Sequence, residues 1–215
     1  MRRPALLGVL AAIALSADTA SAQRQLRRAF EPAVTPFLAG TGFGARVRST
    51  TSTVADYEYN NGIGIGALAE RPWTRRTAVM GMVSATPLTH VTRTYNEAVS
   101  NRARVVVFGL DAGVAGRLKP SAAVFGYVGG GATVGTKPPS EDLSGLHAEP
   151  RATLGVGYDA MRRERTGFRV AYFGHYVFTR SPGADYATVG SSAMDWTLVL
   201  GGRYTFGDWG TGAAR

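Results

Sequence analysis

The side chains in this sequence that are best suited to catalysis or metal binding are three histidines, His90, His147 and His175. Cysteine is absent, so the chain has no thiolate nucleophile, no thiolate metal site and no disulfide. A hydrolytic site needs a histidine between a nucleophile and an orienting acid. Asp195, in the next apolar segment, is the candidate acid for His175, whereas no histidine–carboxylate pair has the spacing of metal ligands. We therefore expect a hydrogen-bonded structural role for His175 and no metal or other cofactor.

A second group of candidate residues is charged and lies at alternate positions within apolar segments. A period of two is typical of β-strands, so these side chains share one face. If that face lines a narrow interior, acids and arginines must pair, because unpaired buried charge is costly. A plug of ion pairs is the favoured interpretation, and a selective arginine-lined pore is the alternative. The predicted interior charge network comprises Arg46, Asp111, Glu149, Arg151, Asp159, Arg169, Asp195 and Arg203, with His175 on the same face.

Two glycine-rich stretches invite comparison with nucleotide-binding loops. "GIGIGALA", from Gly62, fits the dinucleotide spacing, but Pro72 and the segment "RPWTRR" exclude the helix that must follow. "GGGATVGTKP" misses the phosphate-loop pattern, because Thr136 separates Gly135 from Lys137. Both are better explained as glycines in strands, and we expect no nucleotide or nucleic-acid partner.

Eight alternating segments are available to position the charged side chains. They cover residues 33–47, 61–69, 77–89, 103–115, 122–134, 151–160, 167–178 and 194–206. Each can reach the ~9 to 11 residues that a tilted strand needs to cross a bilayer. In the last segment Trp196, Leu198 and Leu200 share one parity, whereas Asp195 and Arg203 share the other. One face is therefore apolar and aromatic, and the opposite face is small or charged.

Glycine recurs on the face opposite the apolar one. In a soluble sandwich that face meets water and has no need of glycine. The interior of a narrow eight-stranded barrel has room only for side chains that fill it. We therefore predict an all-β, eight-stranded antiparallel up-and-down transmembrane barrel, with the small and charged parity inside and the aromatic parity against lipid. The glycines assigned to the interior are Gly40, Gly42, Gly44, Gly62, Gly64, Gly66, Gly109, Gly113, Gly155 and Gly157.

The connections between these segments alternate in length. Long ones include "RSTTSTVADYEYN", "TKPPSEDLSGLHAE" and "TRSPGADYATVGSS", and the short links are "ERPWTRR", "RLKPS" and "MRRERTG". Short periplasmic turns and long outer loops are typical of bacterial outer-membrane barrels. The short links are basic, and their charges are expected to anchor one rim to lipid headgroups. The residues counted there are Glu70, Arg71, Arg75, Arg76, Arg117, Lys119, Arg162, Arg163, Glu164 and Arg165.

Aromatic residues fall near both ends of the predicted strands, as the two interfacial belts of a membrane barrel require. The predicted belt residues at the periplasmic ends are Tyr158, Phe168, Tyr204 and Phe206, and those at the outer ends are Tyr176, Phe178 and Trp196.

The N-terminal segment "MRRPALLGVLAAIALSADTASA" combines two arginines, an apolar core and small residues, which is typical of a secretory signal peptide cleaved after Ala22. The expected organisation is a signal peptide over 1–22, a periplasmic lead-in over 23–32, the barrel over 33–206 and a flexible tail over 207–215. No later stretch reaches 18 apolar residues, so a membrane form must use strands. The net charge of +9 is almost all arginine and suits anionic headgroups in an exported protein.

With its terminal "WTLVLGGRYTF" and this architecture, the chain resembles the small eight-stranded outer-membrane barrels, the OmpX-like, OmpW-like and OmpA-barrel group. The resemblance implies a monomer in the outer membrane of a Gram-negative-type bacterium, in contact with outer-membrane lipids. It also implies that the last strand, ending at Phe206, is read by the barrel-assembly machinery. The tail "GDWGTGAAR" departs from the group, whose members usually stop at that phenylalanine.

Members of this group are structural or surface-interaction proteins, small-solute channels or, in a few relatives, lipid-modifying enzymes. Such enzymes place a histidine and a serine two residues apart on the lipid-facing side, whereas Val177 stands two residues after His175. We expect a structural or surface-interaction role without catalysis. A narrow passive channel for small polar or anionic solutes is the first alternative, and a lipid-modifying enzyme is the second. The outer loops carry the tyrosines suited to a surface ligand, Tyr57, Tyr59, Tyr95 and Tyr186.

Overall fold

The computed structural model describes the part of the chain that forms β-strands and their short links. The described residues are 31–43, 47–49, 55–59, 61–94, 100–119, 122–136, 146–161, 165–178, 186–188 and 192–206. The predicted signal peptide, most of the lead-in and the C-terminal tail lie outside these residues and stay predictions. Within the described ranges, no helix has the length and apolar character needed to cross a membrane.

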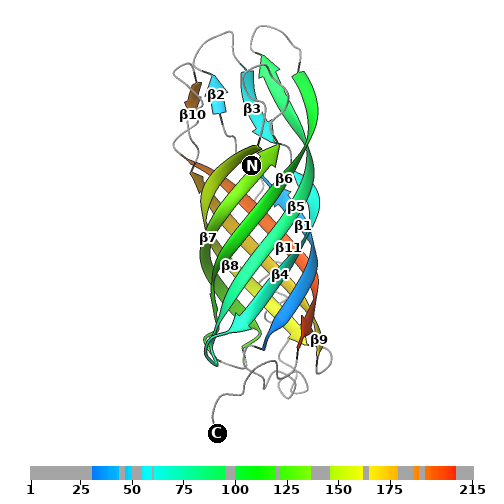
Figure 1. The fold of residues 1–215 in the computed structure, drawn as a ribbon, viewed down its shortest axis with the longest axis vertical. Coiled ribbons are helices and arrows are strands. Elements are labelled where there is room, and N and C mark those ends of the chain that lie inside the picture. The colour runs from blue at the N-terminus through cyan, green and yellow to red at the C-terminus, as the bar shows by residue number, and fades with distance from the viewer. Residues whose placement is uncertain are drawn as a thin grey trace, which may run out of the picture.

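Eight long strands form a closed antiparallel barrel, which confirms the predicted fold class (Figure 1). They are β1 (Ala33–Gly42), β4 (Gly62–Pro72), β5 (Thr77–Thr94), β6 (Ser100–Gly116), β7 (Val124–Thr136), β8 (Leu146–Met161), β9 (Thr166–Phe178) and β11 (Ser192–Thr205). Each strand pairs with the barrel strand that precedes it. The pairing of β1 with β11, here called the seam, closes the sheet from Ala33 opposite Thr205 to Gly42 opposite Trp196.

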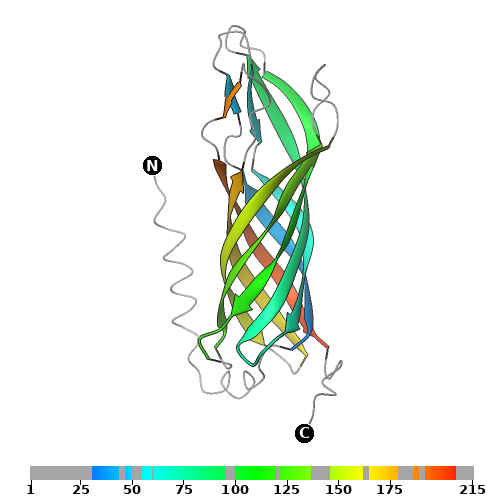
Figure 2. The same ribbon diagram turned by 60° about the vertical axis from the view of Figure 1, so that its left-hand side comes forward.

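One end of the barrel, here called the turn end, carries the three short links and lies opposite the loop end with its long connections (Figure 2). The link from β4 to β5 is held by Thr74, whose hydroxyl accepts hydrogen bonds from the N–H groups of Arg76 and Thr77 at 3.1 and 3.0 Å. The N–H of Arg117 donates to the Arg76 carbonyl at 2.9 Å and ties two neighbouring links together. At the same end the Phe206 N–H donates to the Pro32 carbonyl at 2.8 Å, which continues the seam.

The long connections at the loop end contain further strands, where the sequence predicts loops. They are β2 (Val47–Ser49), β3 (Ala55–Tyr59) and β10 (Tyr186–Thr188), joined in the order β10-β2-β3-β5. The predicted strand over 33–47 is also too long, because β1 ends at Gly42. The physical reason is that β5 continues to Thr94 and offers an edge, with which the alternating, tyrosine-containing "ADYEY" of β3 pairs.

Burial alternates along the barrel strands with the predicted period of two. In β9 the buried positions are Arg169, Ala171, Phe173, His175 and Val177, and in β11 they are Asp195, Thr197, Val199, Gly201, Arg203 and Thr205. The opposite parity is exposed and apolar, with Ile63 at 77% and Leu154 at 67% of their full surface. Large apolar side chains this exposed over the whole wall form a lipid-facing belt.

The glycines of β1 do not face the interior, contrary to the prediction. Thr35 and Phe37 are buried inside, so Gly40 and Gly42 lie on the outward parity. A Cβ on Gly42 would collide with the indole ring of Trp196. Glycine is therefore needed here on the outer surface, where it makes room for the indole ring of Trp196.

Large aromatic rings also occupy the interior, which the prediction reserved for small and charged side chains. Each of three rings packs over a glycine of a neighbouring strand, and a Cβ on that glycine would collide with the ring. The pairs are Phe37 with Gly66, Phe125 with Gly157, and Phe173 with Gly155. The interior glycines thus serve as seats for aromatic rings that fill the narrow lumen.

Candidate functional site

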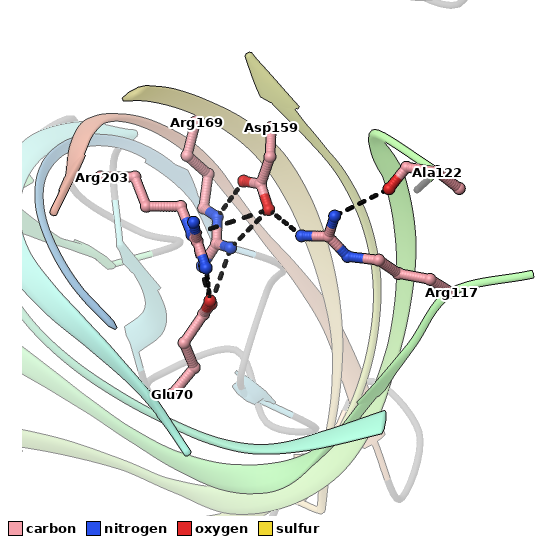
Figure 3. Close-up of polar contacts among 6 residues, drawn as sticks. All are labelled: Glu70, Arg117, Ala122, Asp159, Arg169 and Arg203. Carbon is pink, nitrogen blue, oxygen red and sulfur yellow. Dashed lines mark hydrogen bonds and ion pairs between the residues drawn. The ribbon is translucent and has the colours of Figure 1, made fainter. Parts of the chain in front are cut away.

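Most of the charged residues of the described interior gather in two layers, one toward each end of the barrel. The layer at the turn end, here called the turn-end cluster, consists of Glu70, Arg117, Asp159, Arg169 and Arg203 (Figure 3). Four of these residues lie within the last few positions of a strand or directly after one, and Arg169 lies near the start of β9, all on the inward parity. Because the three links and the seam meet at this end, five residues distant in sequence converge.

Arg169 is the centre of the turn-end cluster. Its Nε and Nη2 atoms donate to the two carboxylate oxygens of Asp159 at 2.6 and 2.8 Å. Its Nη2 atom also lies 2.7 Å from Glu70 Oε2, and its guanidinium carbon lies 4.7 Å from the centroid of the Phe125 ring. The side chain is fully buried. Bidentate, charge-assisted pairing of this kind is the geometry in which a buried arginine is best stabilised.

The two remaining arginines bind the same carboxylates from either side. Arg203 forms an ion pair with Glu70 and lies 3.8 Å from Asp159 Oδ2. Arg117 donates to Asp159 Oδ2 at 2.5 Å and to the Ala122 carbonyl at 2.7 Å. The cluster therefore ties β4, β8, β9, β11 and the link after β6 across the lumen.

Glu70 and Arg117 belong to this cluster, although the sequence predicts both to lie on a basic rim at the headgroups. Only 5% and 8% of their surfaces are exposed. The available signal was parity, because Glu70 continues the inward positions Gly66 and Leu68, and Arg117 continues Ala115. Ending the predicted strands at residues 69 and 115 hid this continuation.

The second layer, here called the loop-end cluster, consists of Asp111, Thr133, Arg151, Thr153, His175 and Thr197. Arg151 forms a two-pronged ion pair with Asp111 and donates to Thr133 Oγ1 at 3.1 Å. Thr153 donates its hydroxyl proton to Asp111 Oδ1 at 2.7 Å. The Asp111–Arg151 pair thus joins β6 to β8 inside the lumen.

His175 extends this network to β11. Its Nδ1 atom lies 2.9 Å from Thr153 Oγ1, and its Nε2 atom lies 3.0 Å from Thr197 Oγ1. The Thr153 hydroxyl hydrogen is used in the hydrogen bond to Asp111, so Thr153 Oγ1 can only accept from His175. The Nδ1 atom of His175 therefore carries a hydrogen and donates it in this contact. Both ring nitrogens are engaged and the side chain is fully buried, which suits a structural histidine.

The other predicted interior residues also have definite places. Asp195 and Glu149 are buried on the inward parity of β11 and β8, at 2% and 7% exposure. Arg46 lies outside the described residues. Within the described ranges, no group of three histidine or carboxylate side chains is placed to hold a metal ion.

An apolar layer separates the two clusters. Its members are buried to at least 94%, and Tyr127 and Phe173 meet edge to face with ring centroids 5.5 Å apart. The larger residues of this layer are Phe37, Leu68, Met80, Met82, Phe125, Tyr127, Phe173 and Val199. The described lumen is therefore filled along its length by ion pairs, apolar side chains and a second set of ion pairs.

The predicted interfacial aromatics lie on the outer wall. Tyr158 is partly buried, whereas the others are 37–47% exposed, namely Phe168, Tyr176, Phe178, Trp196, Tyr204 and Phe206. Neighbouring rings meet edge to face, with centroids 5.2 Å apart for Tyr176 and Phe178 and 5.5 Å apart for Tyr204 and Phe206. These pairs lie at opposite ends of the wall, as interfacial belts do.

No protein-family model matches the sequence, and neither does any curated protein. Solved structures share its fold. The crystal structure of the outer membrane protein OprG from Pseudomonas aeruginosa has a TM-score of 0.56 and 12% sequence identity, covering 85% of this chain and 98% of that one. The solid-state NMR structure of outer membrane protein AlkL in lipid bilayers has a TM-score of 0.57 and 14% identity, covering 83% and 91%. The crystal structure of Neisserial surface protein A has a TM-score of 0.51 and 10% identity, covering 83% of this chain and 99% of that one. The chain has the fold of the small eight-stranded outer-membrane barrels.

Proposed function

We propose that this outer-membrane barrel has a structural and surface-interaction role, with a lumen that neither conducts solutes nor catalyses a reaction. The observation that carries the proposal is the filled interior. An eight-stranded barrel encloses about enough space for its own side chains, and here that space holds two ion-pair clusters and the apolar layer between them. A continuous water path would have to displace all three.

The loop end supports the surface-interaction part of the role. There β2, β3 and β10 extend the sheet beyond the barrel along the outer part of β5. The strands place Tyr57 and Tyr59 on β3 and Tyr186 on β10, whereas Tyr95 lies outside the described residues. A sheet orders its residues before a ligand arrives, so less conformational entropy is lost on binding than from a flexible loop.

The interior histidine argues against lipid chemistry. A lipid-modifying site must open toward the bilayer, whereas His175 is fully buried in the lumen and its two nitrogens contact Thr153 and Thr197. We expect the partners to be outer-membrane lipids around the wall, the barrel-assembly machinery during biogenesis and a surface ligand at the loop end, with the barrel itself a monomer.

Single-channel recording tests the closed lumen. Purified protein in a planar bilayer is expected to stay silent, whereas a Tyr127→Ala/Phe173→Ala double variant, which empties part of the apolar layer, is expected to pass ions. The variant shows that the assay would detect an open lumen. Stepwise currents from the unmodified protein would reject the proposal in favour of a passive channel.

Membrane fractionation and a cell-surface assay test the location and the role. The protein is expected in the outer-membrane fraction, with a mobility that differs between boiled and unboiled gel samples. Cells that display it are expected to adhere to members of a panel of immobilised matrix proteins and glycans, and cells whose segment 47–59 is replaced by a glycine–serine turn are expected not to. Equal adhesion by both cell types would contradict the surface role, and a mass change in lipid A on overexpression would indicate an enzyme instead.

A further inference from the structure

The links that join β4 to β5 and β6 to β7 form one surface at the turn end. The N–H of Arg117 donates to the Arg76 carbonyl at 2.9 Å, so the residues that follow Arg117 lie beside the β4–β5 link. Within that link, the N–H groups of Trp73 and Thr74 donate to the Thr77 carbonyl at 2.9 and 3.0 Å. This surface, here called the basic patch, consists of Arg71, Trp73, Arg75, Arg76, Leu118 and Lys119.

The charged side chains of the basic patch are all positive. Its four basic side chains are exposed, and among the described residues none of them is paired with a carboxylate. Glu70, the acid next to the patch in the sequence, is buried with Arg169 and Arg203. Glu31, which precedes β1, is half-buried and engaged in a contact of its own. The turn-end cluster therefore takes up the neighbouring acid, and four cations remain on the surface.

Two large apolar side chains lie among these cations. Trp73 is 71% exposed and Leu118 is 92% exposed. Arg71 has the outward parity of β4 and pairs with Val79, a residue of the lipid-facing belt that is 49% exposed. The basic patch is thus continuous with the lipid-facing wall at its turn end. Apolar side chains mixed with cations at this position are typical of a surface in the headgroup region of a bilayer.

We propose that the basic patch binds the headgroups of anionic phospholipids in the leaflet around the turn end. The guanidinium and ammonium groups bind the lipid phosphates, and Trp73 and Leu118 contact the adjoining apolar part of the lipid. An anionic glycan or an acidic protein would also attract the cations, but continuity with the lipid-facing wall favours a lipid. The proposal narrows the headgroup contact expected of the basic links to one side of the barrel and one class of lipid.

The β4–β5 link is ordered before a lipid binds. Thr74 Oγ1 accepts hydrogen bonds from the N–H groups of Arg76 and Thr77, and it lies 2.8 Å from Thr77 Oγ1. The backbone that carries Arg75 and Arg76 is therefore held in place, so less conformational entropy is lost on binding. The inference rests on the outer-membrane location of the barrel, and the closed lumen and the surface role can each fail without affecting it.

Quenching of Trp73 fluorescence by brominated lipids tests the basic patch. In the full-length protein with Trp196→Phe and Trp209→Phe, Trp73 is the only tryptophan. The refolded protein is placed in phosphatidylcholine vesicles that contain a small fraction of either brominated phosphatidylglycerol or brominated phosphatidylcholine. We expect phosphatidylglycerol to be enriched beside Trp73 by at least about tenfold, and the enrichment should fall at high salt.

Removing the cations should remove the lipid preference. The triple variant Arg75→Gln/Arg76→Gln/Lys119→Gln is expected to show equal quenching by the two lipids, and Arg76→Gln alone should lower the enrichment about two- to fivefold. The matched control is Arg165→Gln, which removes an exposed cation from the β8–β9 link, on the other side of the barrel in the strand order. This control should keep the full enrichment, and heat-dependent gel mobility verifies that each variant is folded.

Three results would overturn the proposal. The first is equal quenching by the two brominated lipids when all four cations are present. The second is an undiminished enrichment in the folded triple variant. The third is co-sedimentation with purified peptidoglycan that depends on the three substituted cations, without any lipid preference, which would assign the basic patch to the cell wall instead.

Discussion

The seating of Phe173 over Gly155 allows a quantitative test of how the lumen is packed. The two residues face each other directly in the β8–β9 ladder, and Phe173 is 1% exposed. Phe173→Ala leaves a cavity and is expected to lower the free energy of unfolding by about 3 to 5 kcal/mol. Gly155→Val overfills the same space, because a Cβ there collides with the ring, and should cost about 1 to 3 kcal/mol.

The double variant distinguishes this packing from general damage. A valine at position 155 occupies part of the space that the ring leaves. The double variant is therefore expected to lose about 1 to 3 kcal/mol less unfolding free energy than the two single variants lose in sum. Equilibrium urea unfolding in lipid vesicles, followed by tryptophan fluorescence, measures each value. Gly126→Val is the control, because a Cβ there meets no atom within 4 Å, and its effect should stay within about 0.5 kcal/mol. Strictly additive effects would refute the proposed seating.

Two further substitutions test the ion pairs and the outer wall. Arg151→Met leaves Asp111 buried without its arginine partner and should lower the free energy of unfolding in urea by about 3 to 5 kcal/mol. Adding Asp111→Leu to the same chain should restore most of that loss. A double variant no more stable than Arg151→Met alone would contradict the reasoning. Gly42→Val should push the Trp196 indole out of its seat and alter its emission in vesicles, whereas an unchanged spectrum would show that the ring does not rest there.

Parity in the sequence predicted most of the barrel, because a lipid-facing wall and a filled lumen impose opposite chemistry on alternate residues. Strands β9 and β11 show this most clearly, and their inward residues Arg169, His175 and Arg203 all lie in the ionic layers. Asp159 and Arg169 face each other on consecutive strands, only 10 residues apart. The other charged partners were not predictable, because they depend on the register of strands far apart in sequence. Glu70 on β4 pairs with Arg203 on β11, although 133 positions separate them in the sequence.

The errors also have physical causes. The sequence predicts the β1 glycines to be interior, because a narrow lumen needs small residues. The outer wall also needs glycine where a tryptophan ring lies against it, as at Gly42. Segment 55–59 lies in a connection that the sequence predicts to be a loop, and the extension of β5 gives it a partner strand. The local sequence pattern of 55–59 cannot show that β5 extends far enough to pair with it.

The seam has a consequence for the order in which the barrel assembles. The other barrel ladders join strands that follow one another along the wall, so they can form as successive hairpins that close far shorter loops than the seam does. The seam instead joins Ala33 to Thr205, nearly the whole length of the folded chain, and its contacts carry the largest loop-closure entropy. Closure is therefore expected to be the slow, late step of folding. Until it occurs, β1 and β11 each present an unpaired edge, and the chain is most exposed to aggregation in this interval.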